Sequence, residues 1–598
     1  MSKITIGMAT CGRAAGGEDV YQAFEDEIKK HNLTIELGST ACIGMCSQEV
    51  IAEIEIDGWT RLTYGNITDE SVPNIIEKTI NNGEIIKKHV LFQYPPENAT
   101  ITIYQGVPFT NEYSVIKDQV KIVLRNCGNI DPFRISDYLD NDGYKAIKII
   151  LKMKPEEVIE EIGKSGIRGR GGAGFPTAKK WTFCRNVQSD IKYVICNADE
   201  GDPGAFMDRS ILEGDPHSVL EGMIIAGYSI GATEGFIYCR AEYPLALKTL
   251  DKALSDAREN FFLGENILDS GFSFDISIRE GAGAFVCGEE TALIASLEDQ
   301  RGMPRPKPPF PPIKGLFQKP TVVNNVETLA NLPRIIIDSP EAYASIGTPQ
   351  SKGTKVFALA GKVKYTGLVE VPMGMSLRKV IFEIGGGGIK NRRIKAAQLG
   401  GPSGGCIPES MFDIPIDYES INKTGAIMGS GGMVVMDETS CMVDIAKFFL
   451  NFTAEESCGK CTPCRVGTKV MLEILERICD GNGKIEDLDT LERLSETIID
   501  AALCGLGKTA PNPVLTTIKY FRHEYEAHIL EKRCPAHVCP ALLKFRVIPE
   551  LCIKCGLCAR SCESNAIVWE KGKVAFIDKE KCIQCRICIG VCPSRAIE

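Results

Sequence analysis

The cysteines of this chain carry a clear chemical signal, because they recur at the short spacings that iron–sulfur clusters require. The chain has 598 residues, and 25 of them are cysteine. Near the carboxyl end the spacing C-x2-C-x2-C-x3-C occurs twice, and in paired repeats of this kind the fourth cysteine ligates the other cluster. The sequence therefore predicts two [4Fe–4S] clusters with crossed ligands, Cys552, Cys555, Cys558 and Cys592 for one and Cys582, Cys585, Cys588 and Cys562 for the other.

A third set of cysteines lies upstream of these repeats. Cys458, Cys461 and Cys464 follow the spacing C-x2-C-x2-C, and Cys504 comes about 40 residues later. Three clustered thiolates with a distant fourth are typical of a [4Fe–4S] site. Structural zinc is the alternative, although zinc sites favour two paired knuckles.

A short segment between these sets offers ligands of the zinc type. Cys534, His537 and Cys539 form the pattern C-x2-H-x-C, which supplies three of the four ligands that a structural zinc ion needs. We expect Cys479, at a helix end in the same helical region, to be the fourth ligand. His523 or His528 as the fourth ligand, or simply free thiols, are the alternatives.

A glycine-rich stretch, residues 166–177, could bind an anion. It reads Gly-Ile-Arg-Gly-Arg-Gly-Gly-Ala-Gly-Phe-Pro-Thr and leads to Lys179 and Lys180. Glycine lets the backbone N–H groups approach a ligand closely, and such groups at a helix N-terminus attract phosphate. The pattern G-x-G-x-x-G is also present, but a helix rather than a strand is expected before it, so the dinucleotide fingerprint is weak here. A mobile surface loop is the alternative.

Further along, polar and aromatic side chains follow expected strands or begin expected helices. The turn after the strand Tyr193–Cys196 carries Asp199, Glu200 and Asp202, which predicts a metal site or a hydroxyl-binding site, and a solvated turn is the alternative. Glu289 and Glu290 begin a helix, where acids are often only caps. Asn324 and Asn325 suit a flat heterocycle with several acceptors. The aromatic rings of Phe175, Phe183 and Phe310 suit stacking.

The first 90 residues resemble the thioredoxin-like two-iron ferredoxin. Cys11, Cys42 and Cys46 match three of its four ligands, and the fourth position holds Gly16. The resemblance implies a [2Fe–2S] cluster held by these three cysteines and another ligand such as Ser47 or Thr10. A docking domain that has lost its cluster is the alternative.

The elements that position these residues belong to a large chain with several domains. Its net charge is −10 without a long basic run, which argues against nucleic acid as a partner. We expect neither a signal peptide nor a membrane span. Cysteine-rich chains of this length suit a reducing cytoplasm rather than a disulfide scaffold. Seven scattered cysteines are expected to be buried structural thiols, Cys127, Cys184, Cys196, Cys239, Cys287, Cys406 and Cys441.

From Gly166 to Leu329 the ordered segments resemble the NADH-binding flavin subunit of respiratory complex I and its soluble hydrogenase and formate dehydrogenase relatives. The resemblance implies that the FMN phosphate and ribityl chain lie on Gly169, Arg170, Gly171 and Lys180. It implies that the isoalloxazine ring is lined by Asn197, Asp199, Glu200, Gly288, Glu289, Asn324, Asn325 and Thr328. It implies that NADH stacks on the flavin and touches Gly172, Phe175, Phe183, Asp202, Glu290 and Phe310.

The expected fold class is multidomain α/β and α+β. A thioredoxin-like head spans residues 1–90, and a Rossmann-like FMN- and NADH-binding domain spans residues 91–350. A β-grasp insert follows at 351–435 and a helical [4Fe–4S] bundle at 436–530. A zinc-binding linker at 531–548 leads to a bacterial-type two-cluster ferredoxin tail at 549–598.

A head and a tail fused to the flavin domain resemble the beta subunit of soluble, electron-bifurcating [FeFe]-hydrogenases. The resemblance implies FMN, NAD, three [4Fe–4S] clusters and a [2Fe–2S] cluster as cofactors, and the cysteine and histidine pattern described above adds zinc. It implies a catalytic hydrogenase subunit, a small thioredoxin-like [2Fe–2S] subunit and soluble ferredoxin as partners. The alternatives are the flavin subunit of a formate dehydrogenase or complex I, and an electron-wiring scaffold without flavin catalysis.

Overall fold

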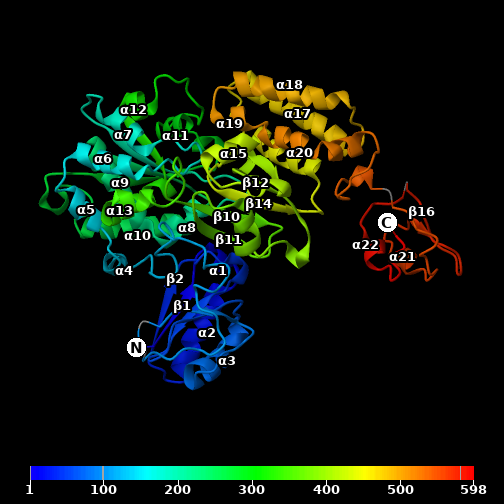
Figure 1. The fold of residues 1–598 in the computed structure, drawn as a ribbon, viewed down its shortest axis with the longest axis horizontal. Helices are drawn as coiled ribbons and strands as arrows, with labels where there is room; N and C mark the ends of the chain where they lie inside the picture. Colours follow the sequence, from blue (N-terminus) through cyan, green and yellow to red (C-terminus); the bar gives the residue numbers. More distant parts are fainter. Residues whose placement is uncertain (1, 97, 99, 544, 580, 598) are drawn as a thin grey trace.

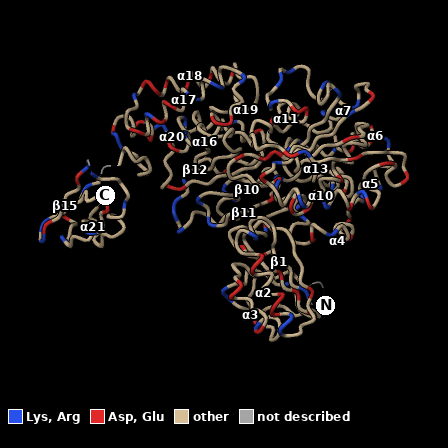
Figure 2. The backbone as a smooth tube through the Cα atoms, turned by 180° about the vertical axis from the view of Figure 1, so that it is seen from behind, with Lys and Arg blue, Asp and Glu red and all other residues tan. Residues whose placement is uncertain are grey.

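Four β-sheets and many helices organise the residues that the computed structural model describes, which are 2–96, 98, 100–543, 545–579 and 581–597. The outermost positions of the predicted domains, residues 1 and 598, lie outside the described residues. In Figure 1 the N-terminal part (blue) projects from a large body, and the C-terminal part (red) lies apart from it. Acidic and basic residues are interspersed along the whole chain (Figure 2).

The N-terminal sheet has the strand order β2-β1-β3-β4-β5. Its strands are β1 (Ser2–Gly7), β2 (Ile35–Thr40), β3 (Ala52–Glu55), β4 (Leu62–Tyr64) and β5 (Val90–Gln93). Helices α2 (Gly17–Lys30) and α3 (Val72–Ile75) pack on it, and α3 continues as a π-helical turn, Ile76–Asn81. Apolar residues at alternating strand positions and at helical spacing, such as Ile4, Ile6 and Phe24, form one buried core.

A second sheet is entirely parallel and has the order β8-β7-β6-β9. Its strands are β6 (Tyr193–Ala198), β7 (Glu234–Arg240), β8 (Asp275–Gly281) and β9 (Thr321–Asn325). Along the chain, β6, β7 and β8 pair one after another across the sheet. Strand β9 then pairs with the other edge of β6. The order therefore reverses between β6 and β9, and in open parallel sheets ligands bind beside the strand ends at such a point.

Helices surround this parallel sheet and share its buried core (Figure 1). They include α6 (Pro155–Ser165), α7 (Thr177–Arg185), α8 (Met207–Gly214), α9 (Pro216–Ile230), α10 (Pro244–Glu259), α11 (Glu290–Leu297) and α13 (Val326–Asp338). Almost every residue of α9 is buried, because this apolar helix lies beneath α13 and the sheet. The glycine-rich stretch connects α6 with α7, so it follows a helix, as the sequence predicts.

The third sheet is mixed and has the order β11-β10-β14-β12-β13. It contains β10 (Thr354–Gly361), β11 (Gly367–Pro372), β12 (Ile394–Leu399), β13 (Gly405–Pro408) and β14 (Gly432–Asp437). The N-terminal part is tied to this sheet, because Leu368 N–H donates to Gly44 O at 2.9 Å and Ser47 N–H donates to Thr366 O at 3.1 Å.

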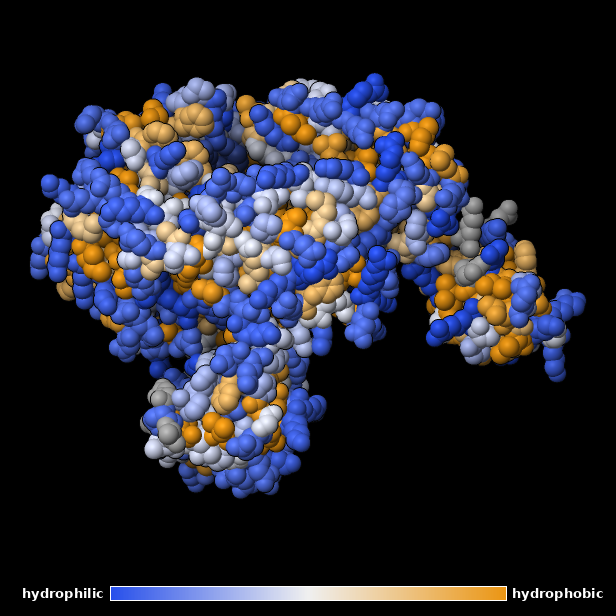
Figure 3. Space-filling model, viewed as in Figure 1, coloured by the Kyte–Doolittle hydropathy of each residue, from blue (hydrophilic) through white to orange (hydrophobic). Residues whose placement is uncertain are grey.

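Helices dominate the chain from residue 442 onward. They are α16 (Met442–Glu455), α17 (Thr462–Cys479), α18 (Glu486–Ala501), α19 (Gly505–Thr509) and α20 (Asn512–Ile529). The tail contains only short elements, α21 (Leu557–Arg560), β15 (Ile567–Val568), β16 (Phe576–Ile577) and α22 (Ile587–Gly590). Large apolar side chains are exposed on the tail (Figure 3), including those of Ile553, Phe576 and Ile583. Within the described residues, none of the helices has the length and hydropathy needed to cross a membrane.

Candidate functional site

A cavity of about 750 Å³ opens where β6 and β9 end, at the point where the strand order reverses. Asn197 and Asn325 are register partners at the ends of these strands, and both line the cavity. Its size lies in the range of cavities that hold cofactors. Fourteen predicted residues line it: Gly169, Gly171, Gly172, Phe175, Lys180, Phe183, Asn197, Gly288, Glu289, Glu290, Phe310, Asn324, Asn325 and Thr328.

The glycine-rich loop forms one wall of the cavity and is fixed from two sides. Arg170 N–H donates to Thr328 Oγ1 at 2.8 Å, and Tyr418 donates from its hydroxyl to Gly169 O at 2.8 Å. Gly174 has a φ of 62°, and a Cβ there would lie 2.7 Å from the Tyr418 ring. Glycine is therefore required for this close approach, and a side chain would force the loop away from its supports.

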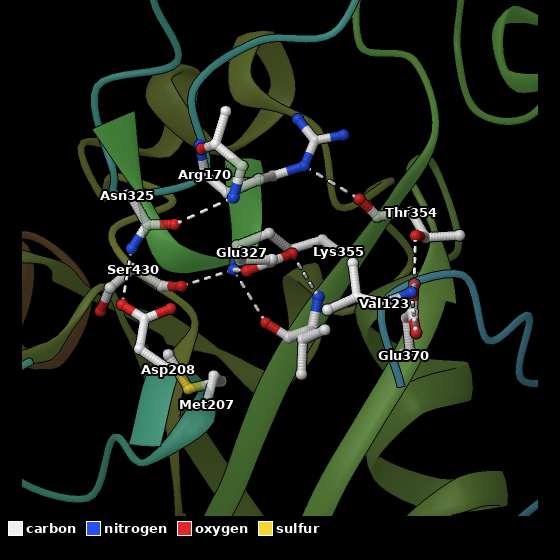
Figure 4. Close-up of polar contacts among 12 residues, drawn as sticks. Val123, Arg170, Met207, Asp208, Asn325, Glu327, Thr354, Lys355, Glu370 and Ser430 are labelled. Atoms are coloured by element: carbon white, nitrogen blue, oxygen red, sulfur yellow. Dashed lines mark hydrogen bonds and ion pairs between the residues drawn. The ribbon is translucent and has the colours of Figure 1, made fainter. Parts of the chain in front are cut away.

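The Arg170 side chain does not reach the cavity, in contrast to the predicted phosphate contact. Its buried guanidinium donates to the backbone oxygens of Thr354, Lys352 and Arg168 and to the Tyr343 hydroxyl, over 2.6–3.0 Å. Figure 4 shows this side chain directed toward Thr354. Arg170 thus joins the glycine-rich loop to the start of β10 rather than lining the cavity.

The acidic turn after β6 also differs from the prediction, since Asp199, Glu200 and Asp202 do not line the cavity. Glu200 accepts the N–H groups of Met207, Asp208 and Arg209 at 2.9–3.2 Å and so caps α8. Asp202 accepts the Ser430 hydroxyl at 2.5 Å. Burial raises the pKa of Asp202 to about 6 and also raises the pKa of Glu200.

Amide side chains on the sheet side of the cavity are held in defined orientations. Asn197 Nδ2 donates to Gly288 O at 2.9 Å, and Trp181 Nε1 donates to Asn324 Oδ1 at 3.0 Å. Asn325 Nδ2 donates to Asp208 Oδ2 at 2.5 Å (Figure 4). Because these hydrogen bonds hold the amide groups, they present fixed hydrogen-bonding edges to whatever fills the cavity.

Two lysines and two glutamates form a charged group in the cavity wall. Lys307 Nζ lies 2.6 Å from Glu289 Oε1 and 2.7 Å from Glu290 Oε1, and Lys180 Nζ lies 3.7 Å from Glu290 Oε2. Desolvation acts to raise the pKa of Glu290, but the two lysines outweigh it and the pKa is lowered. Glu290 is therefore ionised at neutral pH and offers a carboxylate to a ligand.

Aromatic side chains complete the cavity. Phe175, Phe183 and Phe310 line it while remaining 45–54% exposed. Their rings are not used by the protein core, so their faces are available to a planar ligand.

The cysteines of the helical part gather beside this cavity. Cys458, Cys461, Cys464 and Cys504 line one hollow together with Val286 and Pro304 of the parallel-sheet unit. Lys460 Nζ donates to Pro304 O at 2.7 Å, and Phe285 N–H donates to Glu456 Oε2 at 2.9 Å, which joins the two units. Gly505, the residue after Cys504, lines the large cavity itself. The two sites are therefore immediate neighbours.

In the tail, the structure brings together cysteines from both repeats. Cys552, Cys555, Cys558 and Cys592 line one hollow, which is the crossed arrangement that the sequence predicts. In the second set, Cys582 and Cys585 lie close enough to Cys588 to raise its pKa, although burial contributes more to that rise.

The group of zinc-type ligands differs from the predicted set. Ligand atoms of Cys441, His528, Cys534 and Cys539 lie within 4.8 Å of one another. His537 is exposed and is not part of the group, and Cys479 forms a neighbouring group with Asp444 and Cys539. His528, at the end of α20, was an alternative in the sequence, whereas Cys441 was expected to be an inert thiol. Cys441 precedes α16, about 90 residues from the local motif, so spacing alone could not reveal it.

At the N-terminus, the sulfurs of Cys11, Cys42 and Cys46 also lie within 4.8 Å of one another. They come from the start of α1 (Thr10–Ala14) and from the loop after β2. The three predicted ligands are therefore brought together. Of the proposed fourth ligands, Thr10 is engaged, because its hydroxyl donates to Glu213 Oε1 at 2.5 Å.

Comparisons with known proteins agree with this geometry. Residues 162–334 match the Nuo51 FMN-binding domain, residues 444–528 the NADH-ubiquinone oxidoreductase-F iron-sulfur binding region, and residues 551–596 the 4Fe-4S dicluster domain. The HndC subunit of an NADP-reducing hydrogenase from Solidesulfovibrio fructosivorans is 58% identical over 451 residues, which are 75% of this chain and 92% of that protein. The chain belongs to the family of NADH-binding FMN subunits of complex I and soluble hydrogenases.

Other members of this family are also similar. An NADH-quinone oxidoreductase subunit of Aquifex aeolicus is 46% identical over 66% of this chain and 91% of its own length. A crystal structure of an NAD⁺-reducing [NiFe]-hydrogenase in the H₂-reduced state matches 88% of this chain and 84% of its own, at 31% identity and a TM-score of 0.62. As a family member, the chain is an NAD-dependent oxidoreductase subunit with FMN-binding and [4Fe–4S] regions.

Several cavity residues were missed in the sequence, among them Lys307, Ile313 and Gly505. Lys307 stands in the proline-rich segment that also carries the predicted Phe310, so the segment was recognised but not its cation. Gly505 carries no side chain and enters the cavity only because α19 begins there. Only the spatial arrangement could identify it.

Proposed function

We propose that this chain oxidises NADH within a soluble, cytoplasmic hydrogenase complex and exchanges electrons between NAD(H), FMN, iron–sulfur clusters and ferredoxin. The observation that carries this proposal is the contact between the cavity and the hollow of Cys458, Cys461, Cys464 and Cys504 through Gly505. A flavin in the cavity would lie directly beside the first cluster. Such adjacency is what electron transfer from NADH into a cluster chain needs.

The cavity residues fit FMN and NADH by their chemistry. The backbone N–H groups of the glycine-rich loop, followed by α7 and Lys180, suit the phosphate. Asn197, Asn324 and Asn325 suit the polar edge of the isoalloxazine ring, because their amides are held by protein partners. The three exposed phenylalanines suit the planar rings of NADH, and Glu290 suits its ribose hydroxyls.

When bound, FMN supplies the conversion between the two-electron chemistry of NADH and the one-electron chemistry of the clusters. The chain's own part is to align the two ring systems, keep water out and hold the first cluster close. None of these tasks requires a general acid or base. The residues named here are accordingly amides, glycines, aromatic rings, one lysine and one carboxylate.

The two-cluster tail supports exchange with ferredoxin and a catalytic [FeFe]-hydrogenase subunit, with a small thioredoxin-like [2Fe–2S] subunit as a further partner. Electron bifurcation between NAD and ferredoxin is part of this proposal. Two related assemblies are rivals: the matched crystal structure is of an NAD⁺-reducing [NiFe]-hydrogenase, and several relatives are subunits of NADH-quinone oxidoreductases. Identification of co-purifying subunits separates them, and a molybdopterin subunit would indicate a formate dehydrogenase instead.

The test is a cofactor and activity assay on the anaerobically purified complex. We expect FMN, three [4Fe–4S] clusters, one [2Fe–2S] cluster and zinc, and NADH-dependent reduction of viologen. NADPH is assayed in parallel, since one relative is named as NADP-reducing. A chain without flavin absorbance that also lacks NADH–viologen activity after FMN reconstitution would instead be an electron-wiring scaffold.

We also propose zinc for the group Cys441, His528, Cys534 and Cys539. Three thiols and one imidazole within 4.8 Å of one another suit a closed, tetrahedral structural site, whose metal–ligand bonds are about 2.0–2.3 Å long. His528 Nδ1 lies 2.7 Å from Glu524 O, which leaves Nε2 facing the sulfurs. A backbone carbonyl on the second ring nitrogen is the usual support of a metal-bound histidine.

Metal analysis distinguishes this ligand set from the one that the sequence predicts. We expect Cys441→Ser and His528→Ala to lose about one zinc per chain, because each removes one of four ligands. Cys479→Ser and His537→Ala should retain zinc and serve as matched controls. Zinc loss in the control variants, with retention in the first two, would restore the sequence-based set.

A further inference from the structure

The three-cysteine site of the N-terminal part lacks a fourth cysteine, and its surroundings explain why. Position 16, where the thioredoxin-like ferredoxin pattern expects a ligand, holds glycine with φ 97° and ψ 23°. This is the left-handed region, which side-chain-bearing residues rarely adopt. Gly16 adopts this conformation immediately before α2, so a cysteine there would strain the backbone.

A carboxylate lies where the missing ligand is needed. Glu49 Oε1 is 3.6 Å from Cys11 Sγ, while Cys42 Sγ and Cys46 Sγ are 3.9 Å apart. Two ligands on one tetrahedral ion, with bonds of about 2.0–2.3 Å, stand about 3.3–3.8 Å apart. Glu49 Oε1 and Cys11 Sγ therefore have the separation of two ligands on a single iron, and the sulfurs of Cys42 and Cys46 lie only slightly farther apart.

Glu49 is held in this position by its neighbours. Its Oε2 accepts the N–H of Ile51 at 3.0 Å, which leaves Oε1 toward the sulfur. Gly7 lies alongside, and a Cβ there would come within 3.2 Å of Oε2. The carboxylate is therefore enclosed and oriented, rather than free to turn into solvent.

The other oxygen candidates fit less well. The Thr10 hydroxyl is occupied by Glu213, as described above. Ser47 has a buried hydroxyl without a partner among the described residues, but a serine ligand would first have to lose its hydroxyl proton. A carboxylic acid gives up its proton far more readily than an alcohol. Three thiolates and one carboxylate also carry the same total charge as four thiolates.

We propose that Glu49 is the fourth protein ligand of the N-terminal [2Fe–2S] cluster and shares one iron with Cys11, while Cys42 and Cys46 hold the other. The inference rests on the [2Fe–2S] cluster of the proposed function. It leaves the flavin site and the [4Fe–4S] clusters untouched. The loop of Cys42 and Cys46 is already fixed by its backbone bonds to Thr366 and Leu368, so the site is organised before the cluster binds.

The test compares Glu49→Ala and Glu49→Cys with Ser47→Ala and Thr10→Val in the full chain, purified anaerobically. Iron and sulfide are counted, the reduced clusters are followed by EPR, and the oxidised cluster is followed by resonance Raman spectroscopy. We expect Glu49→Ala to lose about two irons and two sulfides per chain together with the [2Fe–2S] signal. Glu49→Cys should keep both irons with an altered iron–ligand Raman spectrum, because sulfur replaces oxygen. Ser47→Ala and Thr10→Val should keep the cluster.

Three outcomes would overturn the inference. One is full iron content and an unchanged EPR signal in Glu49→Ala, and another is cluster loss in Ser47→Ala or Thr10→Val. The third is a Raman spectrum of Glu49→Cys identical to that of the unmodified chain. NADH–viologen activity measured in the same samples keeps the two proposals apart. An unmodified chain that oxidises NADH but holds no [2Fe–2S] cluster refutes the ligand assignment alone.

Discussion

At the residue scale, Glu290 offers a direct test of the NADH site. It is ionised between Lys180 and Lys307 in the cavity wall. Glu290→Lys would place a third positive charge there and remove the carboxylate proposed to bind ribose hydroxyls. We expect KM for NADH to rise by about tenfold or more, which corresponds to about 1.4 kcal/mol, while FMN remains bound.

Steady-state kinetics and flavin absorbance check this prediction. Glu265→Lys makes the same charge reversal at an exposed position and should leave KM unchanged. If NADH kinetics are unaltered in Glu290→Lys, the NADH site lies elsewhere. If FMN is lost as well, the charged group supports the flavin rather than NADH alone.

A second residue links stability to pH. Asp199 lies just beyond β6, and its carboxylate oxygens have no hydrogen-bond partner among the described residues. Desolvation raises its pKa to about 7, although Arg240 Nη1 at 3.6 Å opposes the rise. The folded chain therefore holds this proton up to about pH 7, whereas the unfolded chain loses it near pH 4. The contribution of Asp199 to the free energy of unfolding is therefore full below about pH 4. It is lost as the pH rises from about 4 to 7.

Asp199→Asn removes this titration, so we expect a weaker pH dependence of unfolding in the variant. Between pH 6 and pH 8 the unmodified chain should lose about 1 kcal/mol more stability than the variant, since one pKa unit corresponds to about 1.4 kcal/mol. Anaerobic thermal unfolding at both pH values measures the difference. Glu265→Gln, at an exposed site, should follow the unmodified chain. Identical pH profiles for Asp199→Asn and the unmodified chain would show that Asp199 is ionised throughout.

Sequence reasoning succeeded at this scale where residue type alone decides the role. Glycines, asparagines and phenylalanines of the cavity were predicted, because few other side chains suit a phosphate, a flavin edge or a stacking face. It did not foresee the structural contacts of Arg170 and Glu200, which lie outside the lining of the cavity. Arg170 is drawn to carbonyl groups about 180 residues away, and Glu200 is used by the first turn of α8. Neither partner is visible from the local sequence.

At the element scale, the strands were predictable but their order was not. Tyr193–Cys196 is recognisable as an apolar strand, yet nothing in it reveals that β9 will pair with it 128 residues later. That pairing creates the strand-order reversal and hence the cavity. The glycine-rich loop was correctly separated from the dinucleotide fingerprint, because the helix before it excluded the required strand.

A buried ion pair joins two of these elements. Lys355 of β10 and Glu327 of α13 are almost fully buried, and Lys355 also donates to Val356 O and Ser430 O (Figure 4). Lys355→Met would leave the Glu327 carboxylate buried with Val356 N–H as its remaining donor. We expect a destabilisation of about 3–5 kcal/mol, because an uncompensated buried charge remains.

The double variant Lys355→Met/Glu327→Gln should recover part of the stability lost in Lys355→Met, since neither partner of the ion pair then carries a charge. Thermal unfolding of both variants measures the recovery. Lys573→Met in the exposed pair with Glu570 is the control, and its effect should stay below about 1 kcal/mol. If Lys355→Met is as stable as Lys573→Met, the Glu327 carboxyl must be protonated or hydrated once Lys355 is gone.

At the scale of the whole molecule, the N-terminal part and the tail project from the body at separate places (Figure 1). The cavity lined by the glycine-rich loop and the ends of β6 and β9 belongs to the body. The sequence could predict the cysteine groups of the three [4Fe–4S] sites from their spacing, but not which group borders the cavity. The helical unit occupies that place because Phe285, Pro304 and Val286 contact it directly. The cluster of Cys458, Cys461, Cys464 and Cys504 is therefore the expected entry from the flavin to the other clusters.

This arrangement predicts that substitution of one cysteine can stop electron transfer from the flavin to the tail clusters without stopping reduction of the flavin by NADH. Cys504→Ser removes a ligand beside the cavity and should cost about four irons per chain. NADH should still bleach the flavin, because the flavin-facing residues are unchanged, but the tail clusters should no longer be reduced on the same timescale.

Cys585→Ser, at an exposed tail position, is the matched control, since it also removes a cluster ligand but leaves the cluster beside the cavity in place. Flavin absorbance and EPR after rapid mixing with NADH follow both steps. Tail reduction in Cys504→Ser at the rate of the unmodified chain would require a route from the flavin that bypasses Gly505.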